Sequence, residues 1–482
     1  MCRMSPRQQA AAQRWTLIGT ILGSGAVFVE GTVISVALPA IARDLHLGIA
    51  GLQWVMNGYL LTLSALILFG GSLGDRYSRR IVFAAGLAGF AVASLACAIA
   101  PNLPLLVVAR VVQGAAGALV VPNSLALLET TYTGEARGAA VGHWAAWSAV
   151  SAAFGPLVGG WLIDVSSWRW VFVCVAPFAV TAVVAVGIKG HATERRETHK
   201  RVDYFGAALV TLGLAGVTGA LIVGPDAGFT SGGVIGAGIA GVVLLATFIL
   251  VERRTTGAML PLDVFRVREF TGVNATTLVV YAALNALFFL LMLQLQTALG
   301  YSPLTAGASL LPINALLLLL SPAAGRFAER HGPRMPMVVG ALVAAVGMVL
   351  FARVQPGTRY WTSVLPAAIV FGLGLGTLVA PLTALALRAL GSDKAGLASG
   401  VNNAVARLAG LLAVAIVPLA AGLSGAGAHE VNGANIASGF ERAMFICAGL
   451  CAVGSGVAAL TIRGTAQPAH GRKRELSASA GD

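Results

Sequence analysis

The chain has 482 residues, of which 57% are apolar and only 11% are charged. Soluble domains carry roughly 25% charged residues, so this composition excludes an ordinary soluble protein and indicates one built for a membrane. The formal net charge of +13 would favour a nucleic-acid partner in a soluble domain. We predict no such partner, because the basic residues are distributed as membrane topology requires.

Fourteen apolar runs follow one another along the chain, each close to the roughly 20 residues that cross a bilayer as a helix. The runs are continuous, whereas the strands of a membrane barrel alternate in segments of about ten residues. The sequence therefore predicts an all-helical integral membrane protein with 14 transmembrane helices. The runs lie near residues 15–38, 52–74, 82–100, 104–128, 138–162, 170–189, 204–224, 231–251, 270–298, 303–324, 335–354, 361–387, 396–422 and 441–462. Residues 204–224 and 231–251 can also be read as one broken segment, which leaves a twelve-helix count open.

The basic residues indicate the orientation of the spans. If the N-terminus is placed in the cytoplasm, the two tails and the loops after even-numbered spans hold 25 of the 32 Lys and Arg, and the loops after odd-numbered spans hold five. This is the bias that cytoplasmic loops show, so both termini are predicted to be cytoplasmic. Arg outnumbers Lys 28 to 4, as GC-rich codons produce, and we place the protein in a bacterial cytoplasmic membrane.

Glu30 lies past the middle of the first span, in the stretch VFVEGTVISVALP. An ionised side chain at the centre of a span costs roughly 2.5 to 3.5 kcal/mol on insertion scales, and burial disfavours the ionised form of a carboxyl group. The position therefore predicts a carboxyl that binds a proton at one membrane face and releases it at the other. The alternative is a Glu that is hydrogen-bonded to backbone or to Arg110 for structural reasons.

A short cytoplasmic turn, GSLGDRYSRR, follows the second span and combines small residues with an acid and arginines. Such a cluster at a helix end can hold one side of a carrier shut and release it when the helices move. The alternative is topology alone, although an acid adds nothing to the positive-inside orientation. The predicted gate residues are Gly71, Asp75, Arg76 and Arg79, with Glu329 and Arg330 at the matching place in the second half.

Arg110 is the other charge inside the spans of the first half, about two turns into the fourth span. It must face protein or water and not lipid. We predict that it is the partner of Glu30, each group changing the protonation or hydration of the other. The alternative is a fixed ion pair that only holds helices together.

The fifth span contains a cluster of Gly and Pro in the stretch SAAFGPLVGG, formed by Gly155, Pro156, Gly159 and Gly160. Such a cluster gives a kinked, smooth surface on which another helix can pack closely. His143 and Trp147 are four residues apart, so they share one face of this span and are predicted to line a cavity. A buried histidine with satisfied hydrogen bonds is an equal alternative for His143.

Neutral amides are scattered through the spans of the second half. They suit a cavity for amphipathic molecules, and they equally suit hydrogen bonds between helices, each worth well under about 2 kcal/mol. The predicted substrate-cavity residues are Trp54, Asn57, His143, Trp147, Asn285, Gln294, Asn314 and Asn402. Arg407 is assigned no role.

Three pairs of short matching segments recur in the same order at offsets of 254 to 259 residues. They predict two parallel copies of a six-helix unit, residues 1–190 and 265–463, with two additional spans in a linker at 191–264 and a tail at 464–482. Both copies begin on the same side of the membrane, which places the repeat axis along the membrane normal. The pairs are GSLGDRYSRR with GRFAERHGPR, GALVVPNS with GTLVAPLT, and GEARGAAVG with SDKAGLASG.

Motifs for other energy sources and for catalysis are absent from the sequence. It contains no G-x-x-x-x-G-K-S/T nucleotide loop, no Cys or His cluster with metal spacing and no nucleophile-elbow pattern. We therefore expect no enzyme, no metal and no cofactor, and we predict an ion gradient as the source of energy.

Taken together, these motifs resemble those of the major facilitator superfamily. GSLGDRYSRR is similar to its loop signature between the second and third helices, RVVQGAAG to its fourth-helix arginine motif, and SAAFGPLVGG to the fifth-helix motif of antiporters. EGTVISVALP, LQWVMNGYLL, SSWRWVFVCVAP and AGLASGVNNAVARLAG resemble stretches of the fourteen-helix drug:proton antiporter branch. The likeness covers nearly the whole chain.

The resemblance implies roles for particular residues. Glu30 takes the place of the first-helix acid, which is usually Asp in the family, and Arg110 takes that of the arginine implicated in proton translocation. Asp75 and Arg76 map onto the gate loop. We therefore expect a monomeric, proton-coupled exporter of amphipathic small molecules such as drugs, antibiotics or toxic metabolites. The alternatives are a proton-coupled importer of a small solute and a membrane sensor that transports nothing.

Overall fold

The computed structural model describes residues 6–189, 202–255, 258–391, 394–425 and 431–464. In these ranges the chain forms helices and no strand, and 14 of its helical segments are long and apolar enough to cross a membrane. The prediction of an all-helical protein with 14 spans is confirmed. The separate spans Tyr204–Ala227 and Gly232–Arg254 also decide against the twelve-helix count.

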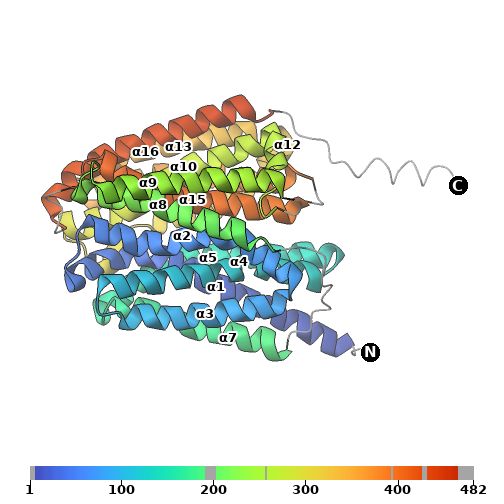
Figure 1. Cartoon of the computed structure of the whole chain (residues 1–482). Helices are drawn as coiled ribbons and strands as arrows, with labels where there is room; N and C mark the ends of the chain where they lie inside the picture. The colour runs from blue at the N-terminus through green and yellow to red at the C-terminus, as the bar shows by residue number, and fades with distance from the viewer. Residues whose placement is uncertain (1–5, 190–201, 256–257, 392–393, 426–430, 465–482) are drawn as a thin grey trace.

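The first six spans form one unit, which Figure 1 draws from blue to cyan-green. A serine or asparagine caps some of these helices, as where the Ser78 side chain accepts a hydrogen bond from the Ile81 amide. The helices are α1 (Pro6–Leu45), α2 (Ile49–Arg76), α3 (Arg79–Ile99), α4 (Leu103–Thr131), α5 (Gly134–Val165), and a sixth span made of α6 (Arg169–Val173) and α7 (Val175–Lys189).

The last six spans form a second unit, drawn from yellow-green to red in Figure 1. Two of its spans contain short π-helical turns and one begins with a short separate helix. The elements are η1 (Leu262–Arg266), α10 (Arg268–Leu293) with η2 (Gln294–Ala298), α11 (Pro303–Ala308), α12 (Leu311–His331), α13 (Arg334–Phe351), η3 (Tyr360–Val364) with α14 (Leu365–Arg388), α15 (Ala395–Ala420) and α16 (Gly433–Thr461).

Two further helices, α8 (Tyr204–Ala227) and α9 (Gly232–Arg254), pack against each other as a hairpin. The helix α8 also contacts α2 of the first unit and α15 of the second. The hairpin therefore lies along one seam between the two units (Figure 1). The proposed linker start at 190–201 and tail at 465–482 lie outside the described residues, so the domain boundaries stay predictions.

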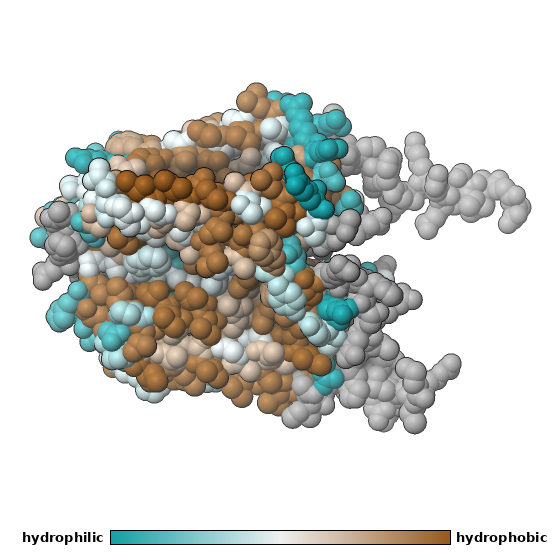
Figure 2. Space-filling model, in the orientation of Figure 1, coloured by the Kyte–Doolittle hydropathy of each residue, from teal (hydrophilic) through white to brown (hydrophobic). Residues whose placement is uncertain are grey.

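The start of α1 and the end of α16 lie on the same side of the molecule, which we call the terminal side; the opposite end is the distal side (Figure 1). Figure 2 shows a broad hydrophobic band between these two ends and hydrophilic residues concentrated at both. Exposed Leu, Ile, Val and Phe side chains on the outer helices make up this band. In a bilayer these side chains face lipid at no cost, because the lipid tails are equally apolar.

Hydrogen bonds join the two units on the distal side. Gln53 on α2 donates to the Val414 carbonyl on α15 at 2.7 Å, and Gln296 of η2 donates to the Val36 carbonyl on α1 at 2.9 Å. A large apolar core containing residues of both units surrounds these contacts. The distal side is therefore closed.

The terminal side is more open at α5. The helices α2 and α15 stay in contact there, where Gly400 approaches Leu68. By contrast, residues 136–147 of α5 are mostly exposed. The terminal part of α5 therefore packs against few neighbours, while the two units remain joined at the distal side.

Close approach of α2 and α4 depends on glycine. A Cβ on Gly70 would collide with the backbone carbonyl of Ala118, and the Asn123 amide donates to the Gly70 carbonyl at 2.8 Å. Because backbone atoms cannot move aside as a flexible side chain can, added volume here forces the two helices apart.

We expect Gly70→Ala to lower the stability of the protein by about 1 to 3 kcal/mol, the usual cost of overpacking. The matched control is Gly236→Ala on α9, where a Cβ meets nothing within 4 Å. The midpoint of thermal unfolding in detergent measures both. Equal midpoints for the two variants would contradict this account of the α2 and α4 contact.

Candidate functional site

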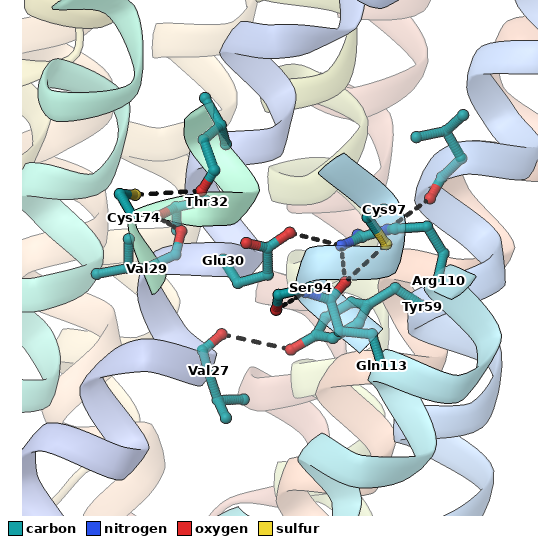
Figure 3. A network of polar contacts seen from close by, with 12 residues as sticks. Val27, Val29, Glu30, Thr32, Tyr59, Ser94, Cys97, Arg110, Gln113 and Cys174 are labelled. Atoms are coloured by element: carbon teal, nitrogen blue, oxygen red, sulfur yellow. Dashed lines mark hydrogen bonds and ion pairs between the residues drawn. The ribbon is translucent and has the colours of Figure 1, made fainter. Parts of the chain in front are cut away.

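A buried ion pair joins the first and fourth spans. The Arg110 Nη1 lies 2.7 Å from the Glu30 Oε1, and both side chains are 0% exposed. Figure 3 shows the two groups pointing toward one another from α1 and α4. The structure thus brings together the two charges that were expected to be partners.

Other groups of the first unit complete the surroundings of Arg110. Its Nη1 also donates to the Gln113 Oε1 at 2.6 Å, and its Nε donates to the Val55 carbonyl on α2 at 3.1 Å. The guanidinium carbon lies 4.5 Å from the centre of the Tyr59 ring, which adds a cation–π contact. The arginine therefore holds α2 and α4 in one arrangement with α1.

The network continues to α3, where Gln113 donates to the Ser94 hydroxyl at 2.8 Å. At its other end, the Glu30 Oε2 has no hydrogen-bond partner and lies on the side away from Arg110 (Figure 3). The Arg110 Nη2 is likewise without a partner. A buried carboxylate with one free oxygen is a place where a proton can be accepted.

The predicted gate residues of the first unit link helices within that unit. The Arg79 side chain pairs with Asp75 at 2.8 Å and donates to the Ala126 carbonyl on α4 at 3.2 Å. Gly71 lies against Pro122 of α4. Arg76 is at the end of α2, and Glu329 and Arg330 are exposed at the end of α12, all on the terminal side.

The Gly and Pro cluster of α5 lies at two helix contacts. A Cβ on Gly155 or on Gly159 would collide with Thr32 or Val33 of α1. A Cβ on Gly160 would collide with the backbone of Pro303 and Leu304 at the start of α11. On the opposite side of this contact, a Cβ on Gly307 of α11 would collide with the Pro156 carbonyl. The cluster thus forms part of the distal closure between the two units.

The amides predicted for the cavity make varied contacts. Asn314 donates to the Ala153 carbonyl at 3.1 Å and so crosses from α12 to α5. Gln294 donates to the Val354 carbonyl, and Asn402 donates to Asn274 and Thr277, both within the second unit. Asn285 bonds the Tyr281 carbonyl of its own helix. Asn57 is fully buried, and neither of its amide atoms has a partner.

The remaining predicted cavity residues do not converge with the ion pair. Trp54 packs beside Gly219 of α8. Trp147 is 55% exposed on α5, and His143 is exposed there with its Nδ1 2.7 Å from the Ala139 carbonyl. The structure instead directs Trp144 inward, where its indole donates to Ser24 at 3.0 Å.

Two residues of the site were not identified from the sequence. Gln113 follows Arg110 by three residues, so the two side chains share a face of α4. This spacing could have identified Gln113 as a neighbour of Arg110 from the sequence. Tyr59 gave no such signal, because an aromatic residue in a span is usually part of the apolar packing. In the described ranges no cluster of three or more potential metal ligands occurs.

Comparison with known proteins identifies the relatives of this chain. The family model described as Major Facilitator Superfamily matches residues 20–414, and a second match covers residues 276–478. A puromycin resistance protein of Streptomyces alboniger is 35% identical over 409 residues, covering 84% of this chain and 80% of the relative. The tetracenomycin C resistance and export protein of Streptomyces glaucescens is 31% identical, covering 86% of this chain and 77% of the relative.

A methylenomycin A resistance protein of Streptomyces coelicolor is 33% identical, covering 82% of this chain and 83% of the relative. Among solved structures, a bacterial homolog of the human lysosomal transporter Spinster, in an inward-facing and unoccupied conformation, matches with a TM-score of 0.65. That match covers 95% of this chain and 98% of the solved chain at 14% identity, so it supports the fold alone.

Removal of either member of the buried pair should leave the other as an uncompensated charge, which costs about 3 to 5 kcal/mol. We expect Glu30→Gln and Arg110→Gln each to lower the unfolding midpoint, and the double variant to recover much of the loss. A double-mutant cycle on thermal unfolding measures this coupling.

The exposed pair of Asp263 and Arg266 provides the control for that cycle. Its side chains are 88% and 86% exposed, so Asp263→Asn and Arg266→Gln should change the midpoint little. Strictly additive effects of the Glu30 and Arg110 substitutions would show that the pair is not coupled in the folded protein.

Proposed function

This chain belongs to the Major Facilitator Superfamily, and we propose that it is a proton-driven exporter of amphipathic small molecules that works by alternating access. It is a membrane transporter of small molecules and not an enzyme. Export is supported by the relatives, which are resistance and export proteins. The use of protons rests on the Glu30 and Arg110 pair.

The free Oε2 of Glu30 is the observation that carries the proton coupling. While Glu30 is ionised, its charge and that of Arg110 compensate each other at 2.7 Å in a site without solvent exposure. A proton on Glu30 removes the attraction, and the buried Arg110 is then a single uncompensated charge. The protonated state therefore favours a rearrangement that rehydrates or re-pairs this arginine.

A movement of Arg110 would act directly on the helices that it contacts. Arg110 bonds the α2 backbone at Val55 and packs on Tyr59, so a shift of its guanidinium acts on α2 as well as on α1. In turn, α2 carries Gln53, which bonds α15 across the distal seam. Protonation of one carboxyl group is thereby linked to the contact between the two units.

The cargo enters from the terminal side in this proposal, and the two units rock to open the distal side. The positive-inside distribution of Lys and Arg supports a cytoplasmic terminal side. The protein then acts as a monomer in a bacterial cytoplasmic membrane, with the proton gradient as its energy source and no cofactor.

We expect purified protein in liposomes with an acidic interior to accumulate an amphipathic dye in exchange for protons, and a protonophore to abolish the accumulation. Glu30→Gln should reduce the gradient-driven movement to the level of empty liposomes, because the side chain no longer titrates. The control Asp263→Asn removes an exposed carboxyl group and should transport normally. Dye that leaves together with protons would indicate a symporter, and an active Glu30→Gln variant would remove Glu30 from the mechanism.

A second test concerns the distal closure at α5 and α11. The side chain added in Gly160→Leu should force the backbones of Gly160 and Pro303 apart. We expect the population of distally open protein to rise by about tenfold or more, which corresponds to a shift of about 1.4 kcal/mol in the free energy of opening. A cysteine introduced as Ala306→Cys, at a fully buried position of α11, reports the opening through labelling by an impermeant maleimide from the distal side.

The matched control for that experiment is Gly138→Leu on the same helix, where a Cβ meets nothing within 4 Å. It should leave the labelling rate at the value of the parent reporter. Unchanged labelling in Gly160→Leu would mean that the cluster does not hold the distal side closed.

A further inference from the structure

A third charge lies within the spans, at the boundary between the two units. Arg407 is on α15 of the second unit, but its guanidinium carbon lies 5.6 Å from the centre of the Phe28 ring on α1. Its Nη1 also lies beside Gly31, the residue after Glu30. Arg407 is half-buried, so it faces the space between the units and not the interior of either one.

The charge of Arg407 is not compensated by the protein. In the described ranges its guanidinium has neither a carboxylate partner nor a hydrogen bond, while Arg110 is paired with Glu30. An unpaired guanidinium in a low-dielectric region attracts an anion strongly. Glu30 and Arg110 compensate each other, so Arg407 leaves a net positive charge at this depth of the spans.

A fully buried amide, that of Asn57, lies on α2, the helix that contacts α15 across this boundary. Gln53 of α2 bonds Val414 of α15, and Leu68 of α2 meets Gly400. This antiparallel register places Asn57 level with Leu411, one helical turn from Arg407. Both amide atoms of Asn57 are without partners, which is costly in a buried site unless a ligand or water completes their hydrogen bonds.

Aromatic side chains lie beside the charge. The Phe28 ring meets Trp144 of α5 edge to face, with 6.4 Å between the ring centroids. On α5, one turn beyond Trp144, the Ser148 hydroxyl is buried and has no partner. The site thus combines a flat apolar wall, one positive charge, and unsatisfied donors and acceptors.

We propose that Arg407, Phe28 and Asn57 form the cargo site, and that its preferred cargo is an aromatic molecule with one ionised acidic group such as a carboxylate, sulfonate or phenolate. The proposal rests on the export function proposed above and specifies the substrate class. The anionic group pairs with Arg407, the ring stacks at Phe28, and the Asn57 amide bonds a polar substituent. Glu30 takes no part in this recognition, because its carboxylate is paired with Arg110 at 2.7 Å.

The test compares two dyes that share an aromatic skeleton and differ in one charge: 8-anilinonaphthalene-1-sulfonate and the neutral N-phenyl-1-naphthylamine. Their equilibrium binding to the purified full-length protein in nanodiscs is measured against empty nanodiscs. Arg407→Gln should weaken binding of the sulfonate by about tenfold or more, the value of a charge-assisted hydrogen bond, and leave binding of the neutral dye unchanged. Arg407→Lys should retain most of the sulfonate affinity.

The control Arg353→Gln removes an exposed arginine two residues beyond the distal end of α13 and should change the binding of neither dye. Equal affinity of wild type and Arg407→Gln for the sulfonate would overturn the proposal. An equal loss of affinity for both dyes in Arg407→Gln would also overturn it, because it would indicate that the arginine has a purely structural role. Because binding needs no gradient, failure of proton-driven transport would refute the export function without affecting this result.

Discussion

A charge in the apolar interior must be compensated, and this constraint organises the first unit. Glu30 and Arg110 have no access to water, so each depends on the other for electrostatic stabilisation. Further contacts of the arginine draw in Gln113, the Val55 carbonyl and the Tyr59 ring. The pair thereby determines how α1, α2 and α4 lie together, and a proton that neutralises one member disturbs all three helices.

The same turn of α1 serves both proposed sites. Glu30 points toward α4, whereas Phe28 and Gly31 lie beside Arg407 of α15. Successive residues of a helix are about 100° apart, so neighbours in sequence face different partners. A small rotation or tilt of α1 therefore changes the surroundings of the carboxyl group and of the cargo site together. This geometry gives a short physical link between proton binding and cargo binding.

The number of spans followed from the sequence because bilayer thickness imposes a length on every helix. Glu30 and Arg110 stood out because charge inside an apolar run is costly and rare. The direction of individual side chains was harder to predict, since lipid-facing and protein-facing positions are both apolar. Trp147 was selected for the cavity and is 55% exposed, while Trp144 packs on Phe28. Arg407 was assigned no role, because only the folded chain shows that its charge has no partner.

The hairpin of α8 and α9 makes the two seams between the units unlike each other. One seam, at α2 and α15, is flanked by α8, and the other, at α5 and α11, has no such cover in the described part of the chain. A molecule that diffuses through the lipid to the first seam meets the α8 and α9 hairpin. At the second seam it meets the helices of the two units directly. Although the two six-helix units are repeats of each other, the two sides of the protein that face the lipid are therefore different.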